Sequence, residues 1–180
     1  MAKTKTYLLY LLLYCCSISC YGNDSELERI NKVQKVYTSL IGVKELTGRN
    51  DGFMVEKIQK AAGIKKGDPW CAATVCFSFV EAGVKAIISG YCPNWFPAKK
   101  TIYTRGKKNN LTPRTADVFG LFFVDMGRIA HEGFIDEWPP DSSMAITVEG
   151  NTNKDGSREG NGCFKKKRLK KQFYKISRWT

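Results

Sequence analysis

The chain has 180 residues, of which 43% are hydrophobic and 26% are charged. This length favours a single domain, and a globular composition at this size excludes any need for disulfides or a metal to hold a core together. The formal net charge is +12, which favours an anionic partner.

The first 22 residues have the pattern of a secretory signal peptide. Lys3 and Lys5 give a positive start, residues 7–16 form an uncharged run of Leu, Tyr and Cys, and small and polar residues occupy positions 17–22. The apolar run is far shorter than the roughly 20 residues that a membrane-spanning helix requires. We therefore expect residues 1–22 to direct export to the periplasm, the cell envelope or the extracellular space.

Two processing routes fit this segment. Cleavage after Ser19 or after Gly22 would release the mature chain. Alternatively, lipid is attached at Cys20, because residues 17–20 resemble a lipobox that lacks its usual Leu. We expect association with a membrane only in the lipid-modified case.

The mature chain, residues 25–180, is expected to be one domain that begins with helices. Residues 25–41 place apolar side chains at three- and four-residue steps, the spacing of an amphipathic helix. A turn at residues 47–52 precedes a second helix over 53–62, and a third helix is expected over 71–82. Residues 84–116 contain three prolines and are expected to be irregular.

The second half changes to strand patterns. Alternating apolar positions between turn residues predict five strands, over 118–124, 128–138, 144–149, 163–169 and 173–179. Helices followed by strands predict an α+β domain with a mostly antiparallel sheet.

Cys71 stands at the start of the third expected helix, directly after Pro69 and Trp70. The unpaired N–H groups and the positive dipole end of a helix favour a thiolate there, and the same N–H groups can hold an oxyanion. Position alone does not decide the matter, because a cysteine in a helix is more often a small core residue.

His131 is the only histidine in the chain. Any Cys–His chemistry must therefore use it, and a multi-histidine metal site is excluded. A cysteine nucleophile needs a base, and the base needs an orienting group. Glu149 and Asn151 alternate onto one face at the end of the next expected strand, where either can accept a ring N–H. The alternative for this segment is an ordinary turn.

The order of Cys, His and Glu-x-Asn resembles the CHAP domain, the cysteine- and histidine-dependent amidohydrolases and peptidases. The resemblance extends from about Gly42 to Trp179. It is carried, in the family's order, by the segments GVKELTGRNDG (Gly42–Gly52), PWCAATVCFSFVEAGV (Pro69–Val84), ADVFGLFF (Ala116–Phe123), GRIAHEGFIDEW (Gly127–Trp138) and VEGNTNKDGSREGNGCFKKKR (Val148–Arg168).

The resemblance implies a papain-like fold and hydrolysis of a peptidoglycan amide bond, either muramoyl–alanine or one within the stem peptide or cross-bridge. It implies Cys71 as nucleophile, His131 as base, Glu149 as orienting acid and Asn151 as a second polar residue beside the histidine. It implies neither a metal nor an organic cofactor, and we expect a monomer. The alternative is a non-catalytic, basic wall-binding domain of the same fold.

Two residues depart from the family pattern. Glu132 follows the histidine where a hydrophobic residue is common, and strand alternation predicts that it faces away from His131. Trp70 precedes the nucleophile where many members carry a Gln that donates to the oxyanion. The second oxyanion donor is therefore left open.

Four residues are expected at the rim of a substrate pocket, namely Asn50, Asp51, Trp70 and Trp95. Each has an alternative role. Asn50 and Asp51 lie in the polar turn and could instead cap the following helix, and the two tryptophans could instead belong to the core.

Three further cysteines of the mature chain, Cys76, Cys92 and Cys163, can form at most one disulfide if Cys71 stays free. The sequence does not select the pair. No CxxC motif occurs, so a structural zinc site is not expected.

Positive charge is densest near the C-terminus, at residues 165–168 and at Lys170 and Lys171. This run is either a solvated strand face or a binding patch. Export argues against nucleic acid as the partner. Peptidoglycan and other anionic envelope polymers fit the expected compartment better.

Overall fold

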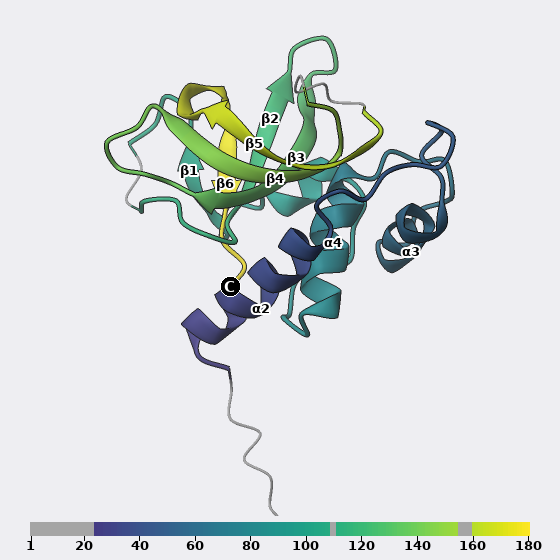
Figure 1. Cartoon of the computed structure of the whole chain (residues 1–180). Helices are drawn as coiled ribbons and strands as arrows, with labels where there is room; N and C mark the ends of the chain where they lie inside the picture. Colours follow the sequence, from purple (N-terminus) through teal and green to yellow (C-terminus); the bar gives the residue numbers. More distant parts are fainter. Residues whose placement is uncertain (1–23, 109–110, 155–159) are drawn as a thin grey trace, which may run out of the picture.

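The computed structural model describes residues 24–108, 111–154 and 160–180 (Figure 1). The predicted signal peptide and the predicted lipid site at Cys20 lie outside the described residues. Within the described ranges, no helix is both long enough and apolar enough to span a bilayer.

Three α-helices form where the sequence predicts them: α2 (Glu26–Ser39), α3 (Phe53–Ala61) and α4 (Cys71–Glu81). The side chain of Ser25 caps α2 by accepting a hydrogen bond from the N–H of Glu28 at 3.2 Å. Acidic residues in the first turn favour the same end of the helix, because they face its positive dipole.

The six described strands form one sheet in which every neighbouring pair is antiparallel. The strands are β1 (Thr101–Thr104), β2 (Val118–Phe123), β3 (Arg128–Glu137), β4 (Met144–Thr152), β5 (Gly162–Leu169) and β6 (Lys175–Ser177), and their order across the sheet is β1-β6-β2-β3-β4-β5. Short 3-10 helices, η2 (Cys92–Trp95) and η3 (Lys170–Gln172), complete the described elements. The predicted α+β class is confirmed.

The sheet differs from the prediction at one edge and at the end of β4, which continues to Thr152 and so excludes the ordinary turn at residues 149–151. β1 lies in the segment that was expected to be irregular, and β6 is shorter than its predicted range of 173–179. All four residues of β1 are half-buried, so the strand has no alternation of buried and exposed positions. β1 forms because it pairs with β6, and the local sequence does not indicate a contact between such distant segments.

Helices α2 and α4 lie beneath the sheet in Figure 1 and cover one of its faces, and α3 packs against α4. The core between these layers centres on aromatic rings. Tyr37 from α2 stacks on Phe134 from β3 at a centroid distance of 4.5 Å, and Phe79 from α4 packs on the same ring at 5.7 Å. A second apolar cluster, which includes Phe119 and Phe173, is separate from this core.

Gly150 allows α4 to approach β4 closely. A Cβ atom at this position would collide with the hydroxyl of Thr74 on α4 and would lie 3.0 Å from the ring of Trp70. The glycine between Glu149 and Asn151 therefore sets the distance between the first turn of α4 and the strand that carries both residues.

Replacing Phe134 by Ala is expected to lower the free energy of unfolding by about 3–5 kcal/mol, because it opens a cavity beneath two aromatic partners. Phe53, which is 87% exposed, provides the matched control. Phe53→Ala should change stability by less than about 0.5 kcal/mol. Urea unfolding followed by tryptophan fluorescence measures both, and equal losses in the two variants would contradict the described core.

Candidate active site

Cys71 is the first residue of α4 and is 5% exposed. No side chain caps the helix, and the first N–H with an intrahelical partner is that of Thr74, which donates to the carbonyl of Trp70 at 2.9 Å. The N–H groups that precede it in the first turn therefore have no acceptor within the helix. The N–H of Ala72 interacts with the Cys71 thiol itself.

His131 on β3 and Glu149 on β4 are fully buried and form a hydrogen bond of 2.9 Å between Nε2 and Oε2. Nδ1 of the ring has no hydrogen-bond partner of normal geometry, although the ring interacts with the Cys71 thiol. Because Nε2 is occupied by Glu149, Nδ1 is the nitrogen left for Cys71. The structure thus brings together the nucleophile, base and orienting acid that the sequence predicts.

Arg168 holds Glu149 in place, and sequence reasoning missed this role. Its guanidinium donates to Oε1 at 2.5 Å and to Oε2 at 2.6 Å, and the hydroxyl of Thr147 donates to Oε1 at 2.6 Å. Arg168 is itself buried on β5. The sequence signal that could have found Arg168 was a positive charge on the strand that follows β4. Arg168 stands in a run of basic residues, however, and the other members of that run on β5 are exposed or half-buried.

These contacts shift the pKa values of all three groups. Hydrogen bonding by the Cys92 thiol lowers the pKa of Cys71 well below its ordinary value, and the His131 ring lowers it further against the effect of burial. Burial lowers the pKa of His131, but Cys71 and Glu149 outweigh it and raise the value to about 9. Burial would raise the pKa of Glu149, but Arg168 and His131 hold it well below its usual range. The directions of these shifts favour a thiolate–imidazolium pair at Cys71 and His131.

Cys92 and Glu132 lie beside the nucleophile, and sequence reasoning assigned neither a place there. Cys92 begins η2, and its sulfur is 3.6 Å from that of Cys71. Glu132 is fully buried and interacts with Cys92 and with the charge of Cys71. Neither carboxylate oxygen has a hydrogen-bond partner of normal geometry. Burial, reinforced by the charge of Cys71, raises the pKa of Glu132 well above its usual range, which favours the neutral carboxyl group.

Asn151 hydrogen-bonds to the residue before the nucleophile, and not to His131 as the family pattern suggests. In the amide orientation that satisfies both ends, its oxygen accepts from the N–H of Trp70 at 3.3 Å and its nitrogen donates to Asn50 Oδ1 at 3.0 Å. Asn50 and Asn151 both adopt positive φ, 53° and 52° respectively. Asn151 therefore ties the 47–52 turn to the start of α4.

Of the four predicted rim residues, only Asn50 lines a cavity that also includes a predicted catalytic residue, Asn151. The cavity has a volume of about 240 Å³ and is further lined by Glu45, Gly48, Gly160 and Asn161. Glu45, which the sequence did not single out, accepts the indole N–H of Trp70 at 2.9 Å. The Trp70 indole is therefore not the second oxyanion donor.

The other two rim residues serve the fold. Trp95 is fully buried and stacks on Phe79 at 5.7 Å, so its alternative role in the core applies. Asp51 closes the 47–52 turn by accepting hydrogen bonds from the N–H and the hydroxyl of Thr47, at 2.9 and 2.7 Å. Gly52, and not Asp51, is the N-cap residue of α3.

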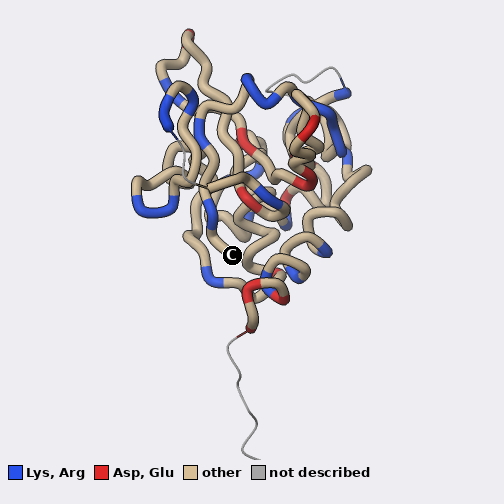
Figure 2. Tube along the Cα trace, turned by 90° about the vertical axis from the view of Figure 1, so that its left-hand side faces the viewer, with Lys and Arg blue, Asp and Glu red and all other residues tan. Residues whose placement is uncertain are grey.

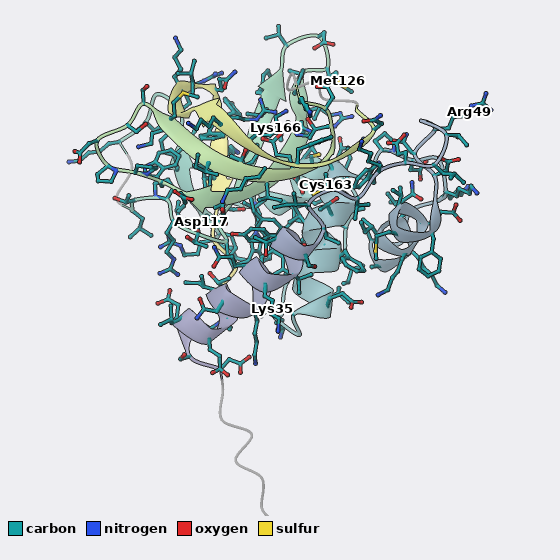
Figure 3. All side chains as sticks on the ribbon, in the orientation of Figure 1. Lys35, Arg49, Asp117, Met126, Cys163 and Lys166 are labelled. Atoms are coloured by element: carbon teal, nitrogen blue, oxygen red, sulfur yellow. The ribbon has the colours of Figure 1, made fainter. Side chains whose placement is uncertain are left out.

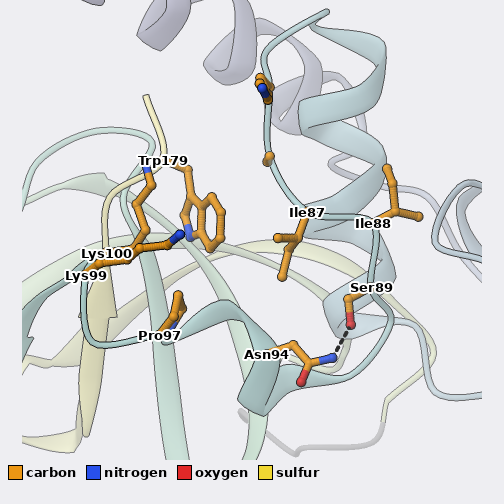
Figure 4. Close-up of a pocket in the computed structure, with 10 residues that line it drawn as sticks. Ile87, Ile88, Ser89, Asn94, Pro97, Lys99, Lys100 and Trp179 are labelled. Carbon is orange, nitrogen blue, oxygen red and sulfur yellow. Dashed lines mark hydrogen bonds between the residues drawn. The ribbon is translucent and has the colours of Figure 1, made fainter.

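A larger cavity, of about 650 Å³, lies away from these residues (Figure 4). It is lined by Ile87, Pro97, Trp179 and three lysines, Lys85, Lys99 and Lys100, and it contains none of the predicted catalytic residues. The ammonium of Lys100 lies over the Trp179 ring at 5.3 Å. It is not the predicted reaction site, because neither Cys71 nor His131 lines it.

The basic run near the C-terminus is mostly engaged within the protein. Lys165 pairs with Asp136 at 2.7 Å, Lys166 donates to the carbonyl of Asn153 at 2.7 Å, and Arg168 pairs with Glu149. Figure 2 shows lysines and arginines spread over strands, loops and helices, without concentration on one element. These basic side chains therefore pair mainly with acceptors of the protein itself.

Among the described residues, no group of three or more His, Cys, Asp and Glu side chains is arranged to hold a metal ion. Comparison of the chain with family models, with curated proteins and with solved structures found no match. The interpretation of the site therefore rests on its own geometry.

Replacing Arg168 by Met should lower the free energy of unfolding at pH 7 by about 3–5 kcal/mol, because it leaves the buried Glu149 carboxylate without its cation. The pKa of Glu149 is lower in the folded state than in the unfolded chain. Its contribution to stability is therefore present above about pH 4.3 and is lost as the pH falls. Urea unfolding at pH 7 and at about pH 3 measures the difference. Lys167→Met, an exposed neighbour on the same strand, should have little effect.

Alkylation of Cys71 by iodoacetamide should be fast at pH 6.5, where an ordinary thiol is only about 1% ionised. His131→Ala should raise the pKa of Cys71 and slow the reaction at this pH by about tenfold or more, because the imidazolium that stabilises the thiolate is gone. Mass spectrometry of the Cys71 peptide across pH 5–10 gives both profiles. Superimposable profiles would show that His131 is not the partner of Cys71.

Proposed function

We propose that the chain is an exported cysteine amidohydrolase of the CHAP type, with a papain-like fold, that hydrolyses an amide bond of peptidoglycan. The observation that carries the proposal is the buried relay from Cys71 through His131 to Glu149, with a 2.9 Å hydrogen bond between the last two. A thiol at a helix start, a histidine raised to a pKa of about 9 and a fixed carboxylate are the parts that a cysteine hydrolase requires.

The first half of the reaction forms a thioester. The Cys71 thiolate attacks the carbonyl carbon of the amide, and the carbonyl electron pair moves onto its oxygen. The N–H groups of the first turn of α4 stabilise this oxyanion, since they have no acceptor within the helix. The His131 imidazolium then gives its proton to the nitrogen as the C–N bond breaks, and the amine leaves.

The second half returns the enzyme to its resting state. His131, now neutral, takes a proton from water, and the resulting hydroxide attacks the thioester carbonyl. The C–S bond breaks, the carboxylic acid leaves and Cys71 returns to the thiolate. Glu149 accepts the Nε2 proton of the ring throughout, so that Nδ1 stays directed at the sulfur. These steps use only groups of this chain and water.

The choice of peptidoglycan as substrate is supported by the sequence. The segments around Cys71, His131 and Glu149 resemble the wall-cleaving family in content and order, and the N-terminal segment has the pattern of an export signal. The net charge of +12 suits an anionic polymer. Asn50 and Asn151 line the 240 Å³ cavity, and Asn151 hydrogen-bonds to the N–H of Trp70 next to Cys71, so these two residues are our candidates for contact with the substrate.

The test is release of soluble fragments from purified sacculi, analysed by mass spectrometry so that the new amine and carboxyl ends identify the cleaved bond. Cys71→Ala should reduce release by at least about 10³-fold, and His131→Ala by about 10²–10⁴-fold. Cys76→Ala, on the same helix, is the matched control and should retain activity, because its thiol hydrogen-bonds to the backbone carbonyls of Ala61 and Ile87 and not to Cys71 or His131.

Undiminished release by Cys71→Ala would overturn the proposal. Sedimentation of the wild-type protein with sacculi, without any release of fragments, would instead support the non-catalytic wall-binding alternative. Circular dichroism of each variant separates a loss of chemistry from a loss of fold.

A further inference from the structure

A second thiol lies against the nucleophile, and the hydrolytic mechanism does not consume it. The sulfur atoms of Cys71 and Cys92 are 3.6 Å apart, both residues are buried, and neither is in a disulfide. A disulfide bond is about 2.05 Å long, so a relative shift of about 1.5 Å would close it. The other described cysteines are differently placed: Cys76 contacts backbone carbonyls, and Cys163 lies on β5 (Figure 3).

The two thiols differ in the way that a redox pair requires. The pKa of Cys71 is lowered well below its ordinary value, so it is the attacking thiolate. The pKa of Cys92 is raised well above its ordinary value, first by hydrogen bonding to Cys71 and then by burial, so it keeps its proton. The sulfur of Cys71 is thus the one that reacts with an oxidant, and the protonated thiol of Cys92 lies next to it.

Glu132 makes the surroundings of the pair neutral. Its carboxyl group is buried next to Cys92 and keeps its proton, because burial and the charge of Cys71 both oppose ionisation. A carboxylate at this position would repel a thiolate at Cys92. A neutral carboxyl group therefore permits Cys92 to release its proton during a reaction with Cys71.

We propose that Cys71 and Cys92 form an oxidative modification site, at which a hydroperoxide converts the catalytic thiol into a reversible Cys71–Cys92 disulfide. This site goes beyond the hydrolytic function, and it depends on the two thiols and not on which amide bond is cut. Its effect on hydrolysis follows directly, because a sulfur bonded to Cys92 cannot attack a carbonyl.

The chemistry balances with the hydroperoxide as the oxidant. The Cys71 thiolate attacks the terminal peroxide oxygen, an S–O bond forms, the O–O bond breaks, and the alkoxide leaves as an alcohol with the proton of His131. The sulfur of Cys92 then attacks that of Cys71, the S–O bond breaks, and hydroxide leaves with the Cys92 proton as water. Two thiols and one hydroperoxide give one disulfide, one alcohol and one water. Two equivalents of a small thiol reverse the cross-link.

Treatment of the purified wild-type protein with about one equivalent of hydrogen peroxide tests the site. Remaining thiols are blocked with N-ethylmaleimide, and intact mass and peptide mapping follow. The expected product has lost two hydrogen atoms, carries a peptide that joins Cys71 to Cys92, and reverts with dithiothreitol. Amidase activity of the same samples should fall and return in parallel.

The Cys92→Ser variant tests whether oxidation requires both thiols or only a reactive thiol at Cys71. It should give no cross-link, and Cys71 should instead accumulate sulfenic acid that dimedone traps. Cys163→Ser is the matched control and should form the Cys71–Cys92 cross-link as the wild type does, because burial raises the pKa of Cys163 to about 12.

Three results would overturn the inference. They are a wild-type protein in which Cys92 is alkylated while Cys71 is oxidised, a cross-link that involves Cys76 or Cys163 instead, and a two-hydrogen loss that persists in Cys92→Ser. The mapping of the wild type decides the question even if the variant does not fold. The mass readout is also independent of wall hydrolysis, so the two proposals can fail separately.

Discussion

The buried carboxylate of Glu149 is the constraint on which the site depends. A carboxylate removed from water costs several kcal/mol unless its charge and lone pairs are satisfied. Arg168 satisfies both oxygens from β5, Thr147 adds a hydroxyl from β4 itself, and His131 completes the set from β3. Three neighbouring strands must therefore pair in register before the acid is stable, and the same pairing orients the histidine.

The second constraint is that helix α4 must deliver its first residue to that histidine. Two contacts fix the start of the helix from outside: Asn151 accepts the N–H of Trp70, and Glu45 accepts the Trp70 indole. Asn151 belongs to strand β4, and Glu45 lies just before the 47–52 turn. The charges then form two pairs, Cys71 with His131 and Glu149 with Arg168, so the buried centre is electrically neutral within a strongly basic chain.

The sequence was sufficient wherever local signals agree with the fold. The helices over 25–41, 53–62 and 71–82 were predictable from apolar spacing and from the glycines that end them, and each forms within two residues of its expected limits. The roles predicted for Cys71, His131 and Glu149 came from the resemblance to the CHAP domain, because the position of each residue alone left a structural alternative open. The antiparallel sheet was predicted from the succession of helices and then strands along the chain.

Other features depend on contacts between distant segments. β1 exists through its pairing with β6, and Cys92 reaches Cys71 because the chain of residues 84–91 turns back along α4. Arg168 was concealed by its basic neighbours, since a run of cations looks the same whether one member is buried or all are solvated. Glu132 was expected to leave His131 undisturbed, and its interactions are with the thiols of Cys92 and Cys71, which no local pattern indicated.

Gly150 links the integrity of the fold to that of the chemistry. Because no side chain fits between β4 and the first turn of α4, the helix layer and the strand layer meet at a single spacing. Cys71 belongs to the helix layer, and His131 and Glu149 belong to the sheet. No single helix or strand carries both the thiol and the imidazole, so only the packing between the layers keeps them in contact. Any loosening of the interface would separate them before it unfolded the domain, and loss of thiolate reactivity would then be the earliest sign of damage to the packing.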